Sequence, residues 1–222
     1  MYDTLLQLPL FQGLCQNDFT SILGKIKLHF SRHKTGEKIV SQGDTCNGLI
    51  FLLKGEMISE TTDKNSIYTW CEYSTGPFVI EPYSLFGMST KYTSSYTALT
   101  DINIVFVDKT FVLSELNKYE IFRLNYLNII SNRSQNLYRK LWENKTNTVE
   151  GKIISFLLSH TEKTVGKKLL KIKMEDFATL LNDTRLSISK ALNELQEAGL
   201  LVLRRKEIEI PAIEKLYFSS TL

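Results

Sequence analysis

Hydrogen-bonding and cationic side chains gather in two short stretches near the carboxyl end of this 222-residue chain. The candidate contact residues are Thr184, Arg185, Leu186, Ser187, Ser189 and Lys190 in the first stretch, and Arg204, Arg205 and Lys206 in the second. Guanidinium, ammonium and hydroxyl groups presented on one short helix can bond to base edges and phosphates in a DNA groove. These residue types therefore indicate double-stranded DNA as the leading partner.

Two short amphipathic helices separated by a tight turn are predicted to position the first stretch. Polar residues 182–184 interrupt the apolar pattern, and Thr184 is well placed to cap the second helix. Ala178 is small enough to let the two helices approach closely. The apolar positions recur at helical spacing and are Phe177, Leu180 and Leu181 in the first helix and Ile188, Leu192 and Leu195 in the second.

A hairpin with a basic tip is predicted to follow these helices. Gly199 ends the second helix, residues 200–203 alternate into the basic tip, and residues 208–210 form the return strand. Two helices and a hairpin occur in many folds, and a basic loop is usually only solvated surface. The ordered combination of capped turn, small residue, glycine stop and basic tip favours a winged helix-turn-helix, whose second helix enters the major groove.

The distribution of charge supports this interpretation. Residues 163–206 contain ten Lys or Arg and five Asp or Glu, a local balance of +5, whereas the whole chain carries +3. The excess of positive charge therefore lies where contact with DNA is proposed.

The whole-chain composition is that of an ordinary globular protein, with 43% hydrophobic and 23% charged residues. The length allows one large domain or two modest ones. We expect neither a membrane-spanning segment nor a secretory signal, and three widely spaced cysteines (Cys15, Cys46 and Cys71) suit a reduced, cytoplasmic setting.

The fold class predicted for the chain is α+β with three successive parts. Residues 1–118 begin with an amphipathic helix around residues 17–26 and continue as short β-prone runs separated by Gly and Pro turns. Many short strands at this spacing predict an antiparallel β-barrel or jelly roll. The expected strands are 39–40, 49–53, 56–59, 67–70, 78–80, 96–98 and 104–107.

Residues 119–145 are predicted to form one long dimerisation helix, since the stretch contains neither Gly nor Pro. Its seam residues follow a three-four spacing and are Leu127, Ile130, Ser134, Leu137 and Leu141. The alternative is a helix packed on its own domain. A seam between two copies would instead hold two recognition helices in two-fold relation, matching a palindromic DNA site. Residues 146–222 complete the chain as the winged helix-turn-helix domain.

This order of parts resembles the cyclic-AMP receptor protein/FNR (CRP/FNR) family of bacterial transcription regulators. The resemblance covers essentially the whole chain, and it includes the opening LPLFQGLCQNDFTSIL, the segment GEKIVSQGDTCNGLIFLLKGEM and the segment ALTDINIVFVD. The spacing from Gly36 through Gly43-Asp44 to Gly55 is fairly specific, since turns between short strands need positive φ. The resemblance implies a cytoplasmic homodimer that binds DNA, with a cyclic-nucleotide-binding-like N-terminal domain and RNA polymerase as a further partner.

Carried onto this chain, the family's recognition-helix positions fall on Arg185, Leu186, Ser187 and Lys190. Arg185 could read guanine through its bidentate fork, and Thr184 and Ser187 would position a phosphate. Leu186 stands where the family has a glutamate, so the preferred DNA sequence should differ from that of the best-known member. The basic tip should contact the DNA backbone without reading sequence.

The N-terminal part departs from the cyclic-AMP-binding members at the residues implied to hold the nucleotide. Glu81-Pro82 stands where a Gly-Glu pair is expected, and Thr93-Ser94 or Ser94-Ser95 stands where an Arg-Ser pair is expected. Loss of the arginine removes the bidentate phosphate partner, so we expect no cyclic-nucleotide binding. If an effector exists, the candidate pocket residues are Glu81, Tyr83, Thr93, Ser94 and Ser95.

Other chemistries find little support in the sequence. The cysteines and histidines lack the clustering of an iron–sulfur, haem or metal site, so no cofactor and no metal are expected, and no nucleophile motif indicates an enzyme. Aromatic residues of the N-terminal part fit a packed core better than an effector pocket, and they are Phe51, Tyr68, Trp70, Tyr73, Phe78, Tyr83 and Phe86. One alternative function stays open, in which this part is a ligand-sensing or protein-docking module and DNA binding is secondary.

Overall fold

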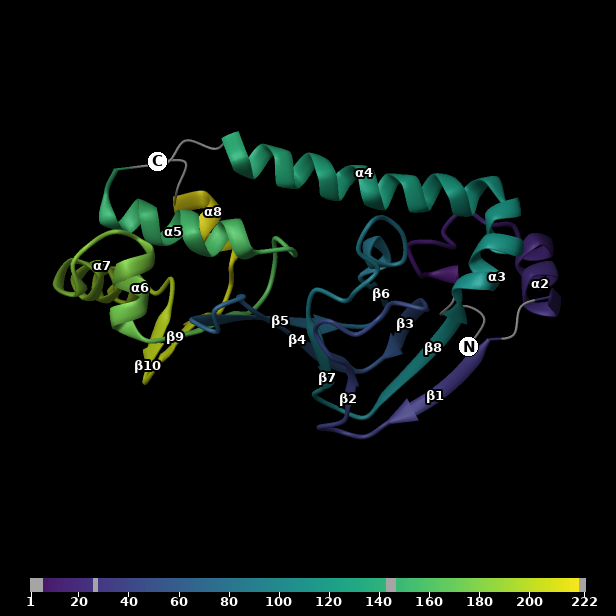
Figure 1. Cartoon of the computed structure of the whole chain (residues 1–222), viewed down its shortest axis with the longest axis horizontal. Helices are drawn as coiled ribbons and strands as arrows, with labels where there is room; N and C mark the ends of the chain where they lie inside the picture. Colours follow the sequence, from purple (N-terminus) through teal and green to yellow (C-terminus); the bar gives the residue numbers. More distant parts are fainter. Residues whose placement is uncertain (1–5, 26–27, 143–146, 220–222) are drawn as a thin grey trace. The chain divides into compact units, whose positions relative to one another are not determined.

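A computed structural model describes residues 6–25, 28–142 and 147–219 of the chain (Figure 1). By their contacts the residues divide into two compact units, unit 1 (residues 1–58 and 74–141) and unit 2 (residues 59–73 and 142–222). None of the helices in these three described ranges is long and apolar enough to cross a bilayer.

Unit 1 contains a four-stranded antiparallel sheet in the order β1-β8-β3-β6. Its strands are β1 (His29–His33), β8 (Ile102–Asp108), β3 (Gly48–Lys54) and β6 (Phe78–Ile80). Strand β2 (Lys38–Val40) pairs antiparallel with β7 (Ser95–Ala98) in the second sheet of the structure. The jelly-roll alternative of the prediction is confirmed, whereas the closed barrel is wrong. Among the described residues, β1 and β6 are the two edge strands of this sheet, and they do not pair with each other.

The helical elements of unit 1 include α2 (Gln16–Lys25), the 3-10 helices η1 (Pro82–Ser84) and η2 (Leu116–Lys118), α3 (Lys109–Ser114) and α4 (Glu120–Trp142). The last residue of α4, Trp142, is counted with unit 2. The long helix predicted over residues 119–145 therefore forms over 120–142, and residues 143–145 of that prediction lie outside the described residues.

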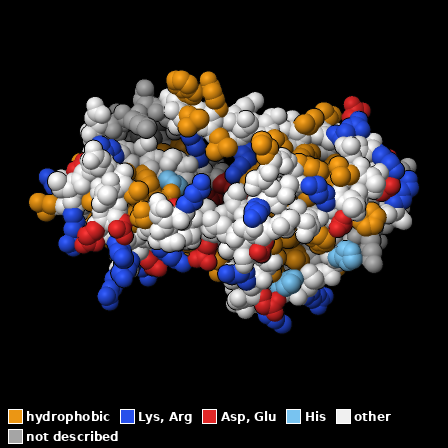
Figure 2. All heavy atoms as spheres, viewed as in Figure 1, with side chains coloured by type: hydrophobic (Ala, Val, Ile, Leu, Met, Phe, Trp, Pro, Cys, Tyr) orange, Lys and Arg blue, Asp and Glu red, His pale blue; other side chains and the backbone are white. Residues whose placement is uncertain are grey.

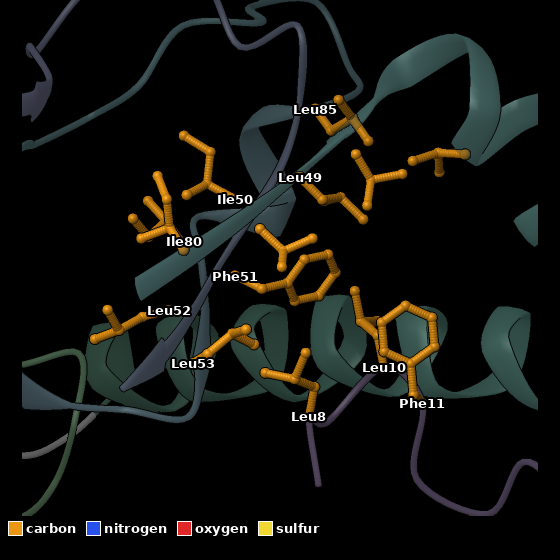
Figure 3. Packing of buried hydrophobic residues seen from close by; sticks show 14 of the residues in the cluster. Leu8, Leu10, Phe11, Leu49, Ile50, Phe51, Leu52, Leu53, Ile80 and Leu85 are labelled. Carbon is orange, nitrogen blue, oxygen red and sulfur yellow. The ribbon is translucent and has the colours of Figure 1, made fainter. Parts of the chain in front are cut away.

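The core of unit 1 forms around β3, whose six residues from Gly48 to Leu53 are all buried. Figure 3 shows side chains of β3 and of the N-terminal segment, among them Phe51 and Phe11, gathered in one cluster. The Phe11 ring lies 5.4 Å from Phe51 and 5.9 Å from Phe122 of α4, measured between ring centroids. Phe122 thus anchors the first part of α4 on the core of unit 1.

The glycines of the family-like spacing lie at turns with positive φ. Gly36, Gly43 and Gly55 have φ values of 85°, 91° and 100°. A Cβ atom at Gly55 would also lie 2.7 Å from the carbonyl oxygen of Asp101. Both conditions exclude larger residues at Gly55.

Unit 2 contains the elements of a winged helix-turn-helix. They are α5 (Val149–His160), β9 (Lys168–Ile172), α6 (Met174–Leu180), α7 (Arg185–Glu197), β10 (Val202–Arg204), β11 (Glu207–Ile210) and α8 (Glu214–Ser219). The helix α8 was not predicted. Strand β9 pairs with β11 on one side, in antiparallel register from Lys168↔Ile210 to Lys171↔Glu207.

The other side of β9 pairs with a strand from the N-terminal half of the sequence. Strands β4 (Glu56–Thr62) and β5 (Tyr68–Thr75) form a hairpin whose residues 59–73 belong to unit 2. Strand β5 runs antiparallel to β9, with Trp70 opposite Leu170. The prediction of a domain over residues 1–118 does not include this pairing of β5 with β9. The two strands are about a hundred residues apart, and nothing local in the sequence specifies that they pair.

The core of unit 2 therefore includes aromatic residues that the sequence pattern places in the N-terminal domain. Trp70 is buried among residues of α5, α6 and α7, and Tyr68 packs against the same cluster. Ile188, Leu192 and Phe177 of the predicted helix pair are fully buried there. Leu180, which is predicted to lie on the apolar stripe of the first helix with Phe177, is instead 40% exposed.

Candidate nucleic-acid interface

The turn between α6 and α7 fixes the angle at which α7 leaves the helix pair. Asn182 adopts a left-handed conformation with φ 50°, which a short polar residue tolerates better than most. The N–H of Asp183 donates to the carbonyl of Ala178 at 3.0 Å and closes the turn. Ala178 itself is buried, with 5% exposure, as its predicted role in close helix approach requires.

Thr184 caps the amino end of α7 as the sequence predicts. Its side-chain oxygen accepts a hydrogen bond from the N–H of Ser187 at 3.1 Å and lies 2.8 Å from the hydroxyl of Ser187. The two hydroxyl groups therefore help to define the first turn of α7 and occupy the helix end at which DNA phosphates commonly bind.

An ion pair ties this turn to α5. The ammonium group of Lys152 lies 3.0 Å from the carboxylate of Asp183. Lys152, together with the N–H of Thr184, lowers the pKa of the Asp183 carboxyl. Asp183 therefore stays ionised at neutral pH and contributes to holding the turn against α5.

The first turns of α7 present their longer side chains to solvent. Arg185, Leu186 and Lys190 are exposed, Leu186 with 81% of its surface accessible, whereas Ser187 and Ser189 are half-buried. Arg185 lies 3.3 Å from Glu175 of α6, and Lys190 lies 3.9 Å from Glu194. Such exposed pairs are weak, so both basic groups can exchange these partners for DNA.

The basic tip closes the hairpin between β10 and β11 with a two-residue turn, Arg205-Lys206. Lys206 adopts φ 61°, and its carbonyl accepts a hydrogen bond from the N–H of Ile172 at 2.9 Å. The tip is thereby attached to β9 through its backbone while its side chains stay exposed. Figure 2 shows Lys and Arg side chains projecting where the β10–β11 hairpin ends in Figure 1.

Part of the positive charge in residues 163–206 faces the β4–β5 hairpin. Lys168 is fully buried, with its ammonium group 3.3 Å from the Glu72 carboxylate, and Lys171 lies 2.7 Å from Glu60. Burial lowers the pKa of Lys163. These three cations belong to the interior or flank of unit 2, so the balance of +5 overstates the charge available to DNA.

Glu72 is a structural residue that sequence reasoning missed. Its carboxylate accepts hydrogen bonds from the indole N–H of Trp70 and from the N–H groups of Glu162 and Lys163, in addition to the pair with Lys168. No local pattern indicates this role, because a lone glutamate in a strand usually faces solvent.

Two groups considered for cofactor or redox chemistry also have structural roles in unit 2. The ring nitrogens of His160 lie 2.7 Å from the Tyr68 hydroxyl and 2.7 Å from the carbonyl of Phe156. Burial raises the pKa of the Cys71 thiol to about 12. Cys71 is therefore a thiol at neutral pH and a poor nucleophile.

The candidate effector residues come together in unit 1 but bond to one another. Glu81 is buried and accepts hydrogen bonds from Thr93 and Ser94, while the Tyr83 hydroxyl lies 3.3 Å from that of Thr93. The hydroxyl of Ser95 has a different partner and accepts a hydrogen bond from the N–H of Gln42 at 3.0 Å.

The predicted seam of α4 is largely exposed on unit 1. Leu127, Leu137 and Leu141 have 60%, 51% and 77% of their surface accessible. Ser134 is exposed as well, and Ile130 is half-buried. Figure 2 shows hydrophobic side chains along the edge of the molecule where α4 runs in Figure 1.

Comparison with known proteins agrees with this architecture. Residues 151–217 match the family described as the Crp-like helix-turn-helix domain. No curated protein matches the chain.

Two solved structures show the same fold at low sequence identity. The catabolite activator protein of Thermus thermophilus is 18% identical, with 96% of this chain and 98% of that chain covered and a TM-score of 0.54. The sensor domain of the transcriptional regulator DNR from Pseudomonas aeruginosa is 15% identical, with 60% of this chain and 92% of that chain covered and a TM-score of 0.50.

The fold and the exposed recognition helix define a DNA-binding protein of the winged helix-turn-helix class. Over residues 151–217 the chain is similar to the Crp-like helix-turn-helix domain. The resemblance to CRP/FNR transcription regulators that the sequence indicated is confirmed.

Proposed function

We propose that the protein is a sequence-specific transcription regulator that acts as a cytoplasmic homodimer on a palindromic DNA site. The observation that carries the proposal is the capped, exposed first turn of α7, in the same unit as an exposed basic hairpin tip. Arg185 reads a base edge, Thr184 and Ser187 position a phosphate, Lys190 does either, and the hairpin tip contacts the backbone. Leu186 touches a thymine methyl group. The protein is not an enzyme, and RNA polymerase is its further partner.

The dimer forms through the seam of α4. A row of exposed leucines on a helix of 23 residues leaves apolar surface in contact with water. Packing against the same helix of a second copy would bury this surface. Two-fold symmetry then places two α7 helices for half-sites about one helical turn, roughly 34 Å, apart.

Selection of bound sequences from a random DNA pool, with and without small-molecule cell extract, tests the proposal. We expect an enriched motif with two-fold symmetry. An enriched motif without symmetry would argue against the dimer, and an unenriched pool would argue against sequence-specific binding. Enrichment that depends on the extract would identify an effector requirement, in favour of the ligand-sensing alternative.

The seam predicts that Leu137→Glu converts the dimer to a monomer. A carboxylate in an apolar seam must be desolvated, so we expect the dimer dissociation constant to rise about tenfold or more. Sedimentation equilibrium measures this constant directly. Gln135→Glu is the matched control, because residue 135 is exposed on α4 but lies off the seam. A Leu137→Glu protein that dimerises like this control would contradict the seam.

The hairpin tip predicts that Arg205→Ala weakens binding to all DNA sequences alike. Removing one phosphate contact should reduce the slope of log K against log salt concentration by about one. Fluorescence anisotropy over a series of salt concentrations, with operator and random duplexes, measures both effects. A loss confined to the operator would assign Arg205 to base reading instead.

A further inference from the structure

Glu81 is a buried acidic residue in a backbone conformation that such residues rarely adopt. It lies between β6 and η1, with 3% of its surface exposed. Its backbone is left-handed, with φ 35° and ψ 58°, a region that costs a non-glycine residue about 1–3 kcal/mol. Compensating interactions must therefore hold it in place.

Those interactions are four hydrogen bonds to its carboxylate. One oxygen accepts from the Ser84 hydroxyl at 2.9 Å and from the N–H of Thr93 at 2.7 Å. The other accepts from the Thr93 hydroxyl at 2.9 Å and from the N–H of Ser94 at 2.9 Å. Because each oxygen has two donors and a carboxylate offers about four lone-pair sites, the acceptor capacity of Glu81 is filled.

The donors together line a site whose chemistry suits an anion. Consecutive backbone N–H groups that point to one spot form a concavity suited to an anion, and hydroxyl groups complete it. The donors are all neutral, so the site favours a negative acceptor without supplying a compensating positive charge.

The loop that begins at Glu81 also contacts α4. The Tyr126 hydroxyl donates to the carbonyl of Pro82 at 2.5 Å, and the Arg133 guanidinium lies 3.4 Å from the centroid of the Tyr83 ring. The Tyr83 hydroxyl in turn lies 3.3 Å from the Thr93 hydroxyl that donates to Glu81. The anion site and the seam helix are thus connected through residues 81–83.

We propose that Glu81 is a built-in ligand of this anion site. Its carboxylate occupies the place of a small carboxylate or phosphate and holds residues 81–83 against α4 without any external molecule. If the proposed function holds, residues 81–83 contact α4 in every folded molecule, with or without an effector. A free anion can bind at this site only if the Glu81 carboxylate moves out of it.

The test is rescue of Glu81→Ala by acetate. This variant leaves the donors of Thr93 and Ser94 without their buried acceptor, and we expect its Tm to fall by roughly 5–15 °C. Sodium acetate should raise the Tm of the variant along a saturating curve, and sodium chloride at the same ionic strength should not. The wild-type Tm should respond equally to the two salts. Inorganic phosphate, tested in the same way, shows whether the site also accepts that anion.

Leu85→Ala is the matched control for general salt effects. Leu85 lies in the same loop and is fully buried, so its removal leaves an apolar cavity that acetate should not stabilise. Equal acetate responses of the two variants, or an unchanged Tm for Glu81→Ala, would overturn the proposal.

Glu81→Gln decides the matter if Glu81→Ala does not fold in either salt. Glutamine has the same size as glutamate, but its amide group directs N–H donors at the donors of residues 93 and 94. We therefore expect a lower Tm for Glu81→Gln. A Tm equal to that of the wild type would refute the proposal that Glu81 is a built-in ligand. All these measurements follow thermal unfolding. Failure of DNA binding therefore leaves them intact, and their failure leaves the DNA-binding proposal intact.

Discussion

Glu72→Ala is expected to destabilise unit 2 by about 3–5 kcal/mol, because it leaves the ammonium group of Lys168 buried without its carboxylate. Lys168 has no exposed surface, and its ammonium group also donates to the carbonyl of Val165 at 3.0 Å. The same substitution removes the acceptor of Trp70 and of two backbone N–H groups. Urea unfolding followed by tryptophan fluorescence measures the change, since Trp70 lies beside the lost carboxylate.

Glu60→Ala is the matched control for this prediction. Glu60 comes from the same hairpin and pairs with Lys171 of the same strand at 2.7 Å, but both side chains are partly exposed. A pair of that kind contributes about 0–1 kcal/mol. Equal free energies of unfolding for the two variants would show that the buried pair does not stabilise the contact between the hairpin and β9.

The second large effect is expected from Arg185→Ala, which should reduce discrimination between the preferred and a wrong base pair by about 10- to 100-fold in each half-site. The reason is geometric, because a guanidinium group forms two parallel hydrogen bonds to guanine and alanine forms none. Binding measured on operator duplexes with each of the four bases at the candidate position gives this ratio. Affinity for random DNA should change much less.

Arg185→Lys separates base reading from simple charge. Lysine keeps the positive charge but lacks the planar fork, so discrimination should fall while the salt slope stays near that of the wild type. Arg205→Ala supplies the opposite pattern, with a changed slope and unchanged discrimination. If Arg185→Ala and Arg205→Ala behave alike, the division between base reading and backbone contact is wrong.

Local patterns in the sequence were sufficient for the winged helix-turn-helix. Helix α7 begins after the Thr184 cap and ends before Gly199, and the hairpin turns at the predicted basic tip. Capping, helical periodicity and turn chemistry act over a few residues, so the order of residues alone specifies them. The residues expected to contact DNA stay predictions, since their role is read from exposure and geometry and not from a bound duplex.

The hydrogen bonding within the candidate effector site could not be predicted from local sequence patterns. The sequence singled out Glu81, Thr93 and Ser94 as candidates for holding an external ligand, and the structure shows their polar groups bonded to one another. That outcome depends on the left-handed turn at Glu81, which turns its carboxylate toward residues twelve and thirteen positions away. Hydrophobic periodicity and motif spacing contain no information about such a turn.

The sequence by itself determined the C-terminal helices, the basic hairpin tip, the strand-rich N-terminal part and the leucine row on α4. Only the tertiary structure decided that residues 59–73 complete the sheet of unit 2, that Lys168 and Lys171 face this hairpin, and that the strands of unit 1 do not close into a barrel. The physical reason is sequence separation. Capping and periodicity are fixed by near neighbours, whereas strand pairing and the burial of a charge depend on which distant segment arrives to share backbone hydrogen bonds and exclude water.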